Sequence, residues 1–279
     1  MRVLITGAGG QVGRELVAAF AGHDVVGADR SALDVGDRDA VLGAITALRP
    51  HTVVHAAAWT AVDACEDDPD RAFRVNALGT RHVADGARRV GAHLCYLSTD
   101  HVFDGEKPGP YLEWDQPRPR SVYGRSKLAG EAELGPGSTT VRTSWVCGRH
   151  GSNVARTVLR LAAQGQPLAF VDDQRGHPTV AADLAQAVRG LVVGHLPGVF
   201  HVTNQGVATW FELAQAVLAA AGLDPDRVRP IATAELRPPR RAPRPANSVL
   251  DNAALRLCGL PLLPHYRESL ERLVRELAA

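Results

Sequence analysis

The chain has 279 residues, of which 45% are hydrophobic and 22% are charged, a composition typical of globular proteins rather than disordered segments. Its 31 basic and 30 acidic side chains leave a formal net charge of +1, which gives no reason to expect nucleic acid or an anionic membrane as a partner. The length predicts one large domain, or a main domain with a smaller lobe.

Apolar runs and cysteines indicate a cytoplasmic protein. The longest apolar runs are shorter than a membrane span, and residues 1–20 lack the apolar core and cleavage site of a signal peptide. The four cysteines are scattered, without Cys-x-x-Cys spacing or clustered histidines. This pattern favours buried thiols in a reducing cytoplasm over disulfides or a zinc site.

The first 20 residues have the pattern of a strand, a glycine turn and a helix. An apolar run over 3–6 precedes a glycine-rich segment over 7–13, and residues 15–20 have helical periodicity. Gly7 permits a tight turn, Gly10 lets the backbone approach a pyrophosphate, and Gly13 allows the helix to pack closely on the strand. The helix N-terminus supplies N–H groups for phosphates. The segment therefore predicts a dinucleotide site.

A second strand over 24–30 ends in two residues that favour different cofactors. Asp29 lies where an acidic residue binds the adenosine ribose 2′-hydroxyl of NAD. Arg30 follows directly and has the charge to bind the 2′-phosphate of NADP. Asp29 is also open to a purely structural interpretation as a cap at the end of the strand. The sequence leaves NAD and NADP as alternatives.

Strands and helices alternate as far as residue 143. Further elements are predicted over 37–48 (helix), 52–55 (strand), 69–90 (helix), 93–98 (strand) and 139–143 (strand). Repeated βα alternation specifies an α/β fold with a doubly wound parallel sheet, the Rossmann architecture. Ala56, Ala57 and Ala58 follow the third strand, where small residues let the backbone pass close to a cofactor.

Candidate catalytic groups follow the fourth strand and continue into a helix. Thr99 stands at the carboxyl end of that strand, where open α/β sheets bind ligands. Tyr123 and Lys127 are one helical turn apart on a shared face. An ammonium within about 4–6 Å of a phenol lowers the phenol pKa by about 1–3, toward the range for acid–base catalysis. Tyr-x-x-x-Lys is also an ordinary exposed helix face, but the glycine segment favours catalysis.

The second half of the chain predicts a different unit. We expect a helix over 180–194, a segment over 198–202 that rejoins the sheet, and helices over 208–221 and 264–277. The domain prediction is a dinucleotide-binding domain over 1–143, rejoined by about 180–202, and a substrate-binding lobe over 144–179 and 203–279.

The Pro/Arg-rich stretch 237–247 cannot form a regular helix or a central strand. It is interpreted either as a solvated or disordered loop, or as a mobile arm whose guanidiniums grip a substrate diphosphate.

The glycine segment, Thr99, Tyr123 and Lys127 together resemble the extended short-chain dehydrogenase/reductase superfamily. Further stretches are similar to the dTDP-4-dehydrorhamnose reductase family, and the resemblance runs from residue 1 to about 275. These stretches are 6–13, 57–63, 98–103, 121–131, 142–145, 173–179 and 244–251.

The resemblance implies a set of site residues. The implied catalytic residues are Thr99, Tyr123 and Lys127. The implied binding residues for NADPH or NADH are Gly7, Gly10, Gln11, Val12, Gly13, Asp29, Arg30, Asp34, Val35, Ala56, Ala57, Ala58 and Thr60, joined by Tyr123 and Lys127. The implied substrate-binding residues are Thr99, Asp100, Trp145 and Arg175.

The resemblance implies NAD(P)H-dependent reduction of the C4 ketone of a nucleotide-linked 4-keto-6-deoxysugar, giving dTDP-L-rhamnose or a related deoxysugar. It also implies a homodimer. His101 replaces a usual tyrosine and Cys147 a common aromatic residue, which leaves the sugar open. Glu15 matches a magnesium ligand of some members, but the sequence offers no convincing second ligand, so we expect no metal.

Two alternatives remain. One is a non-catalytic regulatory subunit that keeps nucleotide binding; an intact Thr99, Tyr123 and Lys127 set argues against it. The other is an epimerase or dehydratase of the same superfamily. Dehydratases typically place an Asp-Glu pair after the hydroxyl residue, whereas Thr99 is followed here by Asp100 and His101. The sequence therefore favours a simple reductase.

Overall fold

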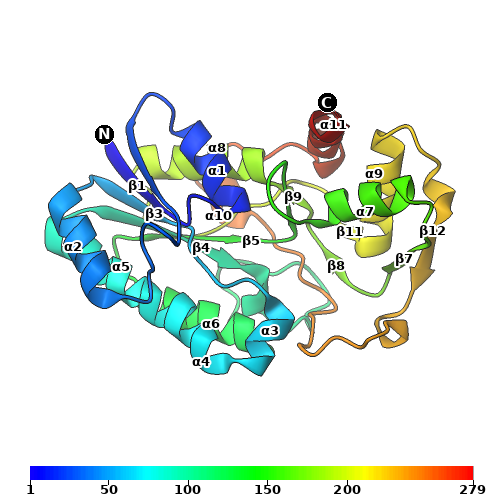
Figure 1. Ribbon diagram of the computed structural model, residues 1–279, viewed down its shortest axis with the longest axis horizontal. Helices are drawn as coiled ribbons and strands as arrows, with labels where there is room; N and C mark the ends of the chain where they lie inside the picture. Colours follow the sequence, from blue (N-terminus) through cyan, green and yellow to red (C-terminus); the bar gives the residue numbers. More distant parts are fainter. Residues whose placement is uncertain (279) are drawn as a thin grey trace.

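The computed structural model, which describes residues 1–278, has a six-stranded parallel sheet at its centre (Figure 1). The strand order is β10-β5-β4-β3-β1-β2, and each neighbouring pair is parallel. The strands are β1 Arg2–Thr6, β2 Asp24–Ala28, β3 Thr52–His55, β4 His93–Thr99, β5 Thr139–Thr143 and β10 Gly198–His201. The predicted doubly wound parallel sheet is confirmed.

Helices cover both faces of this sheet (Figure 1). On one face, Leu16, Leu184 and Leu255 belong to the hydrophobic core. On the other face, Val41 and Ile45 belong to a second core. Burial on both faces explains the apolar runs within β1, β3 and β4. The first face carries α1 Gln11–Ala19, α8 Ala181–Val193 and α10 Ala253–Leu257; the second carries α2 Arg38–Leu48, α5 Gly79–Val90 and α6 Val122–Glu131.

The single helix predicted over 69–90 is interrupted. The chain forms α4 Pro69–Phe73, a π-helical turn Arg74–Leu78 and then α5. The turn contains Asn76, whose side chain accepts from the Trp59 backbone N–H at 2.8 Å and donates to the Trp59 carbonyl at 3.1 Å. The same amide donates to Ser126 Oγ at 3.0 Å. The π turn therefore joins the loop after β3 to helix α6.

The second half of the chain adds a lobe with its own core. Leu213, Val217, Leu270 and Val158 belong to this core. Its helices are α7 Val154–Ala163, α9 Trp210–Ala220 and α11 Tyr266–Ala278, and its strands are β6 Val146–Cys147, β7 Leu168–Val171, β8 Arg175–Gly176, β9 Thr179–Val180, β11 Ala208–Thr209 and β12 Val228–Ile231. Helix α3 Val62–Asp67 and short 3₁₀ turns Asp100–Val102, Pro225–Arg227 and Thr233–Glu235 complete the described elements.

The chain returns to the sheet within the second half. Strand β10 pairs with β5, as predicted for 198–202, and α8 joins the core beside α1. The domain limits themselves stay a prediction, which the separate core of the lobe supports. Residues 237–247, called the arm below, contain no helix or strand. Among residues 1–278 no helix has the length and apolarity needed to span a bilayer.

Candidate active site

A cavity of about 520 Å³, the central cavity, lies at the carboxyl ends of β1, β3 and β4. Ligands of open α/β sheets bind where the strand order reverses, here between β1 and β3. Most of the predicted site residues line this cavity. They are Gly7, Gly10, Gln11, Val12, Gly13, Ala56, Ala58, Thr60, Thr99, Asp100, Tyr123, Lys127 and Trp145.

Helix α6 brings Tyr123 and Lys127 to the end of β4. Ser121 caps the helix by accepting from the Gly124 N–H at 3.1 Å, and Glu66 accepts from the Val122 N–H at 2.7 Å. A Cβ at Gly124 would lie 2.2 Å from the His101 carbonyl oxygen. Glycine at this position therefore lets α6 pack directly against the turn that follows Thr99.

Tyr123 is 8% exposed, and burial raises its pKa above the ordinary value of 10.0. A hydrogen bond with Thr99 acts in the opposite direction, and the Asp100 charge adds to the rise. The expectation that Lys127 lowers the pKa of this phenol is therefore wrong for this structure. Burial dominates because the phenolate loses solvation in the closed site. Near neutral pH Tyr123 keeps its proton.

The Lys127 amine also lies in the buried part of the cavity wall. Its Nζ donates to the Leu97 carbonyl at 2.6 Å and lies 3.9 Å from the centre of the Tyr96 ring. Burial lowers the pKa of Lys127 to about 7, although the Glu131 charge opposes the change. Glu131 itself forms a buried ion pair with Arg142 at 2.7 Å. The Lys127 amine therefore changes between its charged and neutral forms near neutral pH.

The glycine loop, residues 7–13, packs against the segment that follows β3. Gly7 has φ +70°, and a Cβ there would lie 2.6 Å from the Ala57 backbone nitrogen. A Cβ at Gly13 would lie 2.1 Å from the Gly7 carbonyl oxygen. Gly10 is the N-cap of α1 and provides no side-chain cap. The first N–H groups of α1 therefore point toward the cavity without a capping side chain, which suits a bound phosphate.

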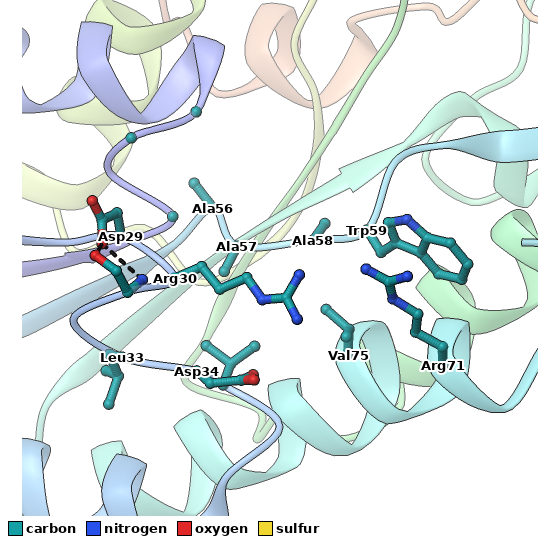
Figure 2. Close-up of a pocket in the computed structure, with 15 residues that line it drawn as sticks. Asp29, Arg30, Leu33, Asp34, Ala56, Ala57, Ala58, Trp59, Arg71 and Val75 are labelled. Atoms are coloured by element: carbon teal, nitrogen blue, oxygen red, sulfur yellow. Dashed lines mark hydrogen bonds between the residues drawn. The ribbon is translucent and has the colours of Figure 1, made fainter. Parts of the chain in front are cut away.

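A second cavity of about 430 Å³, the β2 cavity, extends from the glycine loop past the end of β2 (Figure 2). Asp29 Oδ1 accepts from the Ser31 N–H at 2.9 Å, the Ser31 hydroxyl at 2.6 Å and the Ala32 N–H at 3.1 Å. Asp29 thus caps its own turn, as the structural alternative proposed. The Arg30 side chain extends across the cavity toward Val75 (Figure 2).

Other predicted residues also line the β2 cavity, together with residues that were not predicted. Asp34, Val35 and Ala57 belong to its wall, as the resemblance implied. Trp59 and Arg71 were not predicted, and the Arg71 guanidinium lies 4.4 Å from the centre of the Trp59 ring (Figure 2). Arg71 lies in the segment 69–90, for which the sequence predicted a helix and no binding role.

Trp145 lies where the central cavity meets a third one of about 400 Å³, the lobe cavity. Its ring stacks on Trp210 with 3.7 Å between the ring centroids, and Trp210 Nε1 donates to Gln174 Oε1 at 3.2 Å. A Cβ at Gly176 would lie 2.6 Å from the Trp145 ring. Trp210 was missed because it is far from Trp145 in the sequence.

Asp100 presents a buried acceptor to the central cavity. Its Oδ1 accepts from the Thr99 hydroxyl at 2.9 Å. Its Oδ2 has no hydrogen-bond partner within residues 1–278, although Asp100 is 2% exposed. Buried carboxylate oxygens are normally hydrogen-bonded. Asp100 Oδ2 is therefore a buried acceptor without a partner, in a residue that lines the central cavity.

Arg175 is not brought to these cavities. Its side chain is exposed on β8, and it lies outside the residues that line the three cavities. Its backbone holds the end of the arm: the Arg175 N–H donates to the Ala246 carbonyl at 2.8 Å, and the Ser248 N–H donates to the Arg175 carbonyl at 2.8 Å. Its predicted role in substrate binding stays a prediction that these cavities do not support.

Glu15 does not stand free to bind a metal. Its carboxylate accepts from Arg149 at 2.8 and 3.2 Å, and His150 Nε2 lies 3.7 Å away. Throughout the described residues, no three His, Cys, Asp or Glu side chains gather in a group that could hold a metal ion.

Comparison with known proteins agrees with this geometry. The model of the RmlD substrate binding domain family matches residues 1–279. A dTDP-4-dehydrorhamnose reductase of Streptomyces griseus is 43% identical over 280 residues, covering 96% of this chain and 91% of that protein. The chain belongs to the dTDP-4-dehydrorhamnose reductase family. A dTDP-4-keto-6-deoxy-D-glucose reductase of Streptomyces niveus is 40% identical over 275 residues, covering 96% and 95% of the two chains.

The structure is likewise similar to a solved member of the dTDP-4-dehydrorhamnose reductase family. The Bacillus anthracis enzyme in complex with NADP matches with a TM-score of 0.95 at 38% identity, covering 99% of both chains. Of the two departures from the family pattern, His101 reaches the central and lobe cavities, and its ring meets Tyr123 edge-on at 5.4 Å. Cys147 is buried in β6 and lies outside the residues that line them.

Proposed function

We propose that this protein reduces the C4 ketone of a dTDP-linked 4-keto-6-deoxysugar with a reduced nicotinamide cofactor. The observation that carries the proposal is the convergence of Thr99, Tyr123 and Lys127 with the glycine loop on one cavity. Family membership and the printed activities of the Streptomyces relatives support it. A sugar nucleotide is thus the substrate class.

Each of the three polar residues has a role in this reaction. The bound cofactor supplies the hydride to C4. Tyr123 holds its proton at neutral pH and donates it to the alkoxide oxygen that forms at C4. The Thr99 hydroxyl, which donates to Asp100 in this structure, rotates to donate to the same oxygen and adds an electrostatic contribution. Lys127, which lines the same cavity, would bind the ribose next to the nicotinamide.

The substrate occupies the junction of the central and lobe cavities. Trp145 and Trp210 offer a flat apolar wall, and Asp100 lines the same cavity. Arg240 and Arg244 of the arm line the lobe cavity. Arginine forks match phosphate oxygens well, so these two guanidiniums bind the diphosphate. This role adopts the second interpretation of the Pro/Arg-rich stretch.

The cofactor preferred in this proposal is NADPH. Asp29 Oδ1 is already engaged by its own turn, which weakens its competition for a ribose 2′-hydroxyl. The Arg30 guanidinium enters the β2 cavity and supplies a cation for a 2′-phosphate (Figure 2). The NADP complex of the Bacillus anthracis relative supports the same choice.

The proposal extends to the compartment, the partners and the oligomeric state of the enzyme. Cys65, Cys95 and Cys147 are buried free thiols, which suit a reducing cytoplasm. The balanced charge of +1 suits a small-molecule substrate rather than nucleic acid. A homodimer is proposed by analogy with the family.

The decisive experiment replaces Tyr123 with phenylalanine. Tyr123→Phe should lose turnover by about 10²–10⁴-fold, the usual contribution of a positioned proton donor, while cofactor affinity stays within about twofold. Oxidation of NADPH with a dTDP-4-keto-6-deoxysugar is followed by absorbance. Tyr266→Phe, which removes the same hydroxyl from the core of the lobe, is the matched control. Near-normal turnover in Tyr123→Phe would reject the assignment.

A further inference from the structure

The arm lines part of the lobe cavity and is attached to helix α3. The Asp63 carboxylate of α3 accepts most of the hydrogen bonds that join the arm to this helix. Arg244 donates to its two carboxylate oxygens at 2.8 and 3.2 Å, and the Ala242 N–H donates at 3.1 Å. Arg240 adds a longer contact of 3.4 Å. A separate outer pair joins Arg241 to Asp67. The Asp63 carboxylate therefore binds three alternate residues of the arm, Arg240, Ala242 and Arg244.

Among the arm residues, Arg244 is the one that lines the central cavity. Its side chain is 17% exposed and lines both the central and the lobe cavities. Arg240, by contrast, is 55% exposed and lines only the lobe cavity. The two-point contact with Asp63 uses both terminal nitrogens of Arg244 and so fixes the plane of its guanidinium.

The backbone on the C-terminal side of Arg244 is also fixed. A Cβ at Gly105 would lie 2.6 Å from the Pro245 Cα, so this part of the arm lies directly on the loop after β4. The Asn247 side chain donates to the Lys107 carbonyl at 2.7 Å and the Gly109 carbonyl at 2.9 Å. Backbone packing thus fixes the position of the arm next to Arg244, and the ion pair with Asp63 fixes the position of the Arg244 guanidinium.

The carboxylate belongs to the cofactor side of the site. Val62, immediately before Asp63, and Thr60, three residues before it, line the central cavity. Asp63 therefore connects the wall of the cofactor site to an arginine that belongs to the substrate lobe. Arginine loses much side-chain freedom when it is immobilised by a ligand, and prior fixation reduces that loss.

We propose that Asp63 is a positioning residue for the substrate diphosphate. It holds the Arg244 guanidinium at the junction of the central and lobe cavities, so that the diphosphate meets an arginine already in place. The inference rests on the proposed function, because it takes a nucleotide diphosphate as the ligand.

The test measures the affinity for dTDP and dTMP, by calorimetry with NADPH present, in Asp63→Asn and Asp67→Asn. Asp63→Asn keeps the shape of the side chain but removes its charge and one of its two acceptors. It should weaken dTDP binding about tenfold, leave dTMP binding within about twofold, and raise KM for the nucleotide sugar while kcat changes little. Asp67→Asn removes only the outer ion pair and should bind both nucleotides as the wild type does.

Three outcomes would overturn the inference. The first is wild-type affinity for dTDP in Asp63→Asn. The second is an equal loss for dTDP and dTMP, which would indicate a general displacement of the arm. The third is a loss of dTDP affinity in Asp67→Asn as large as the loss in Asp63→Asn. Retained NADPH affinity and an unchanged melting temperature exclude misfolding as the cause. A wild-type protein that binds dTDP but oxidises no NADPH with 4-keto sugars would instead refute the proposed function.

Discussion

Lys127 is expected to change its charge near neutral pH. It is 2% exposed, and burial lowers its pKa from the ordinary 10.5 to about 7, against the opposing charge of Glu131. The carbonyl of Leu97 at 2.6 Å and the Tyr96 ring at 3.9 Å are its immediate contacts. They solvate the ammonium less well than water does, so the neutral amine is favoured.

The effect on stability follows from the difference between the folded and unfolded pKa values. Below pH 7 the lysine is protonated in both states, and the folded protein carries the full cost of the buried charge. Above pH 7 the folded state loses the proton while the unfolded state keeps it, so the free energy of unfolding rises with pH. The slope approaches about 1.4 kcal/mol per pH unit, which amounts to about 2 kcal/mol between pH 7 and pH 9.

The sequence makes this measurement direct, because Lys107 and Lys127 are its only two lysines. Protein labelled with ¹³C at lysine Cε gives two signals, and Lys107→Met assigns the one that remains to Lys127. Urea unfolding of the wild type and of Lys127→Met between pH 6 and about 9 then compares their stabilities. The rise with pH should be about 2 kcal/mol smaller in Lys127→Met. Lys107→Met should keep the rise, since Lys127 is still present.

Two results would refute this reasoning. A Lys127 signal that titrates near the ordinary lysine pKa of about 10.4 would show that the amine is well solvated in the folded protein. Parallel pH profiles of stability for the wild type and Lys127→Met would show that its charge is not affected by folding.

Three further changes test the site. Gly13→Ala puts a Cβ 2.1 Å from a backbone oxygen of the glycine loop and should weaken NADPH binding at least about tenfold by fluorescence titration; Gly43→Ala, with open space around its Cβ, should not. Gly176→Ala puts a Cβ 2.6 Å from the Trp145 ring and should raise KM for the sugar nucleotide about tenfold, with NADPH affinity unchanged. Arg30→Ala should lower kcat/KM for NADPH about tenfold and leave that for NADH nearly unchanged; equal losses would contradict a 2′-phosphate role.

Much of the fold was predictable because its determinants are local. The strand, glycine loop and helix at the start of the chain are encoded within 20 residues, and buried parallel strands show as continuous apolar runs. The interrupted helix over 69–90 was not predictable in the same way. A π turn inserts one residue into a helix without a local composition signal, and here its determinant is the distant contact of Asn76 with Trp59 and Ser126.

The candidate site was predictable as far as residue types and helical spacing define it. Thr99, Tyr123 and Lys127 reach one cavity because a strand end and one helical turn place them there. Trp210 and Arg71 were missed, since only tertiary packing brings them to the ligand cavities. The direction of the Tyr123 pKa was wrong because charge spacing is visible in a sequence, whereas the depth of burial is not.

The return of β10 to the sheet has a consequence for how the protein is built. Strand β5 gains its outer neighbour from residues 198–201, after the chain has already passed through residues 144–179. Leu184, Val188 and Phe200 then complete the apolar layer that Leu16 begins. A fragment ending at residue 143 would expose both an open sheet edge and half of that layer. The sheet and this apolar layer are therefore complete only when residues from both halves of the chain are present.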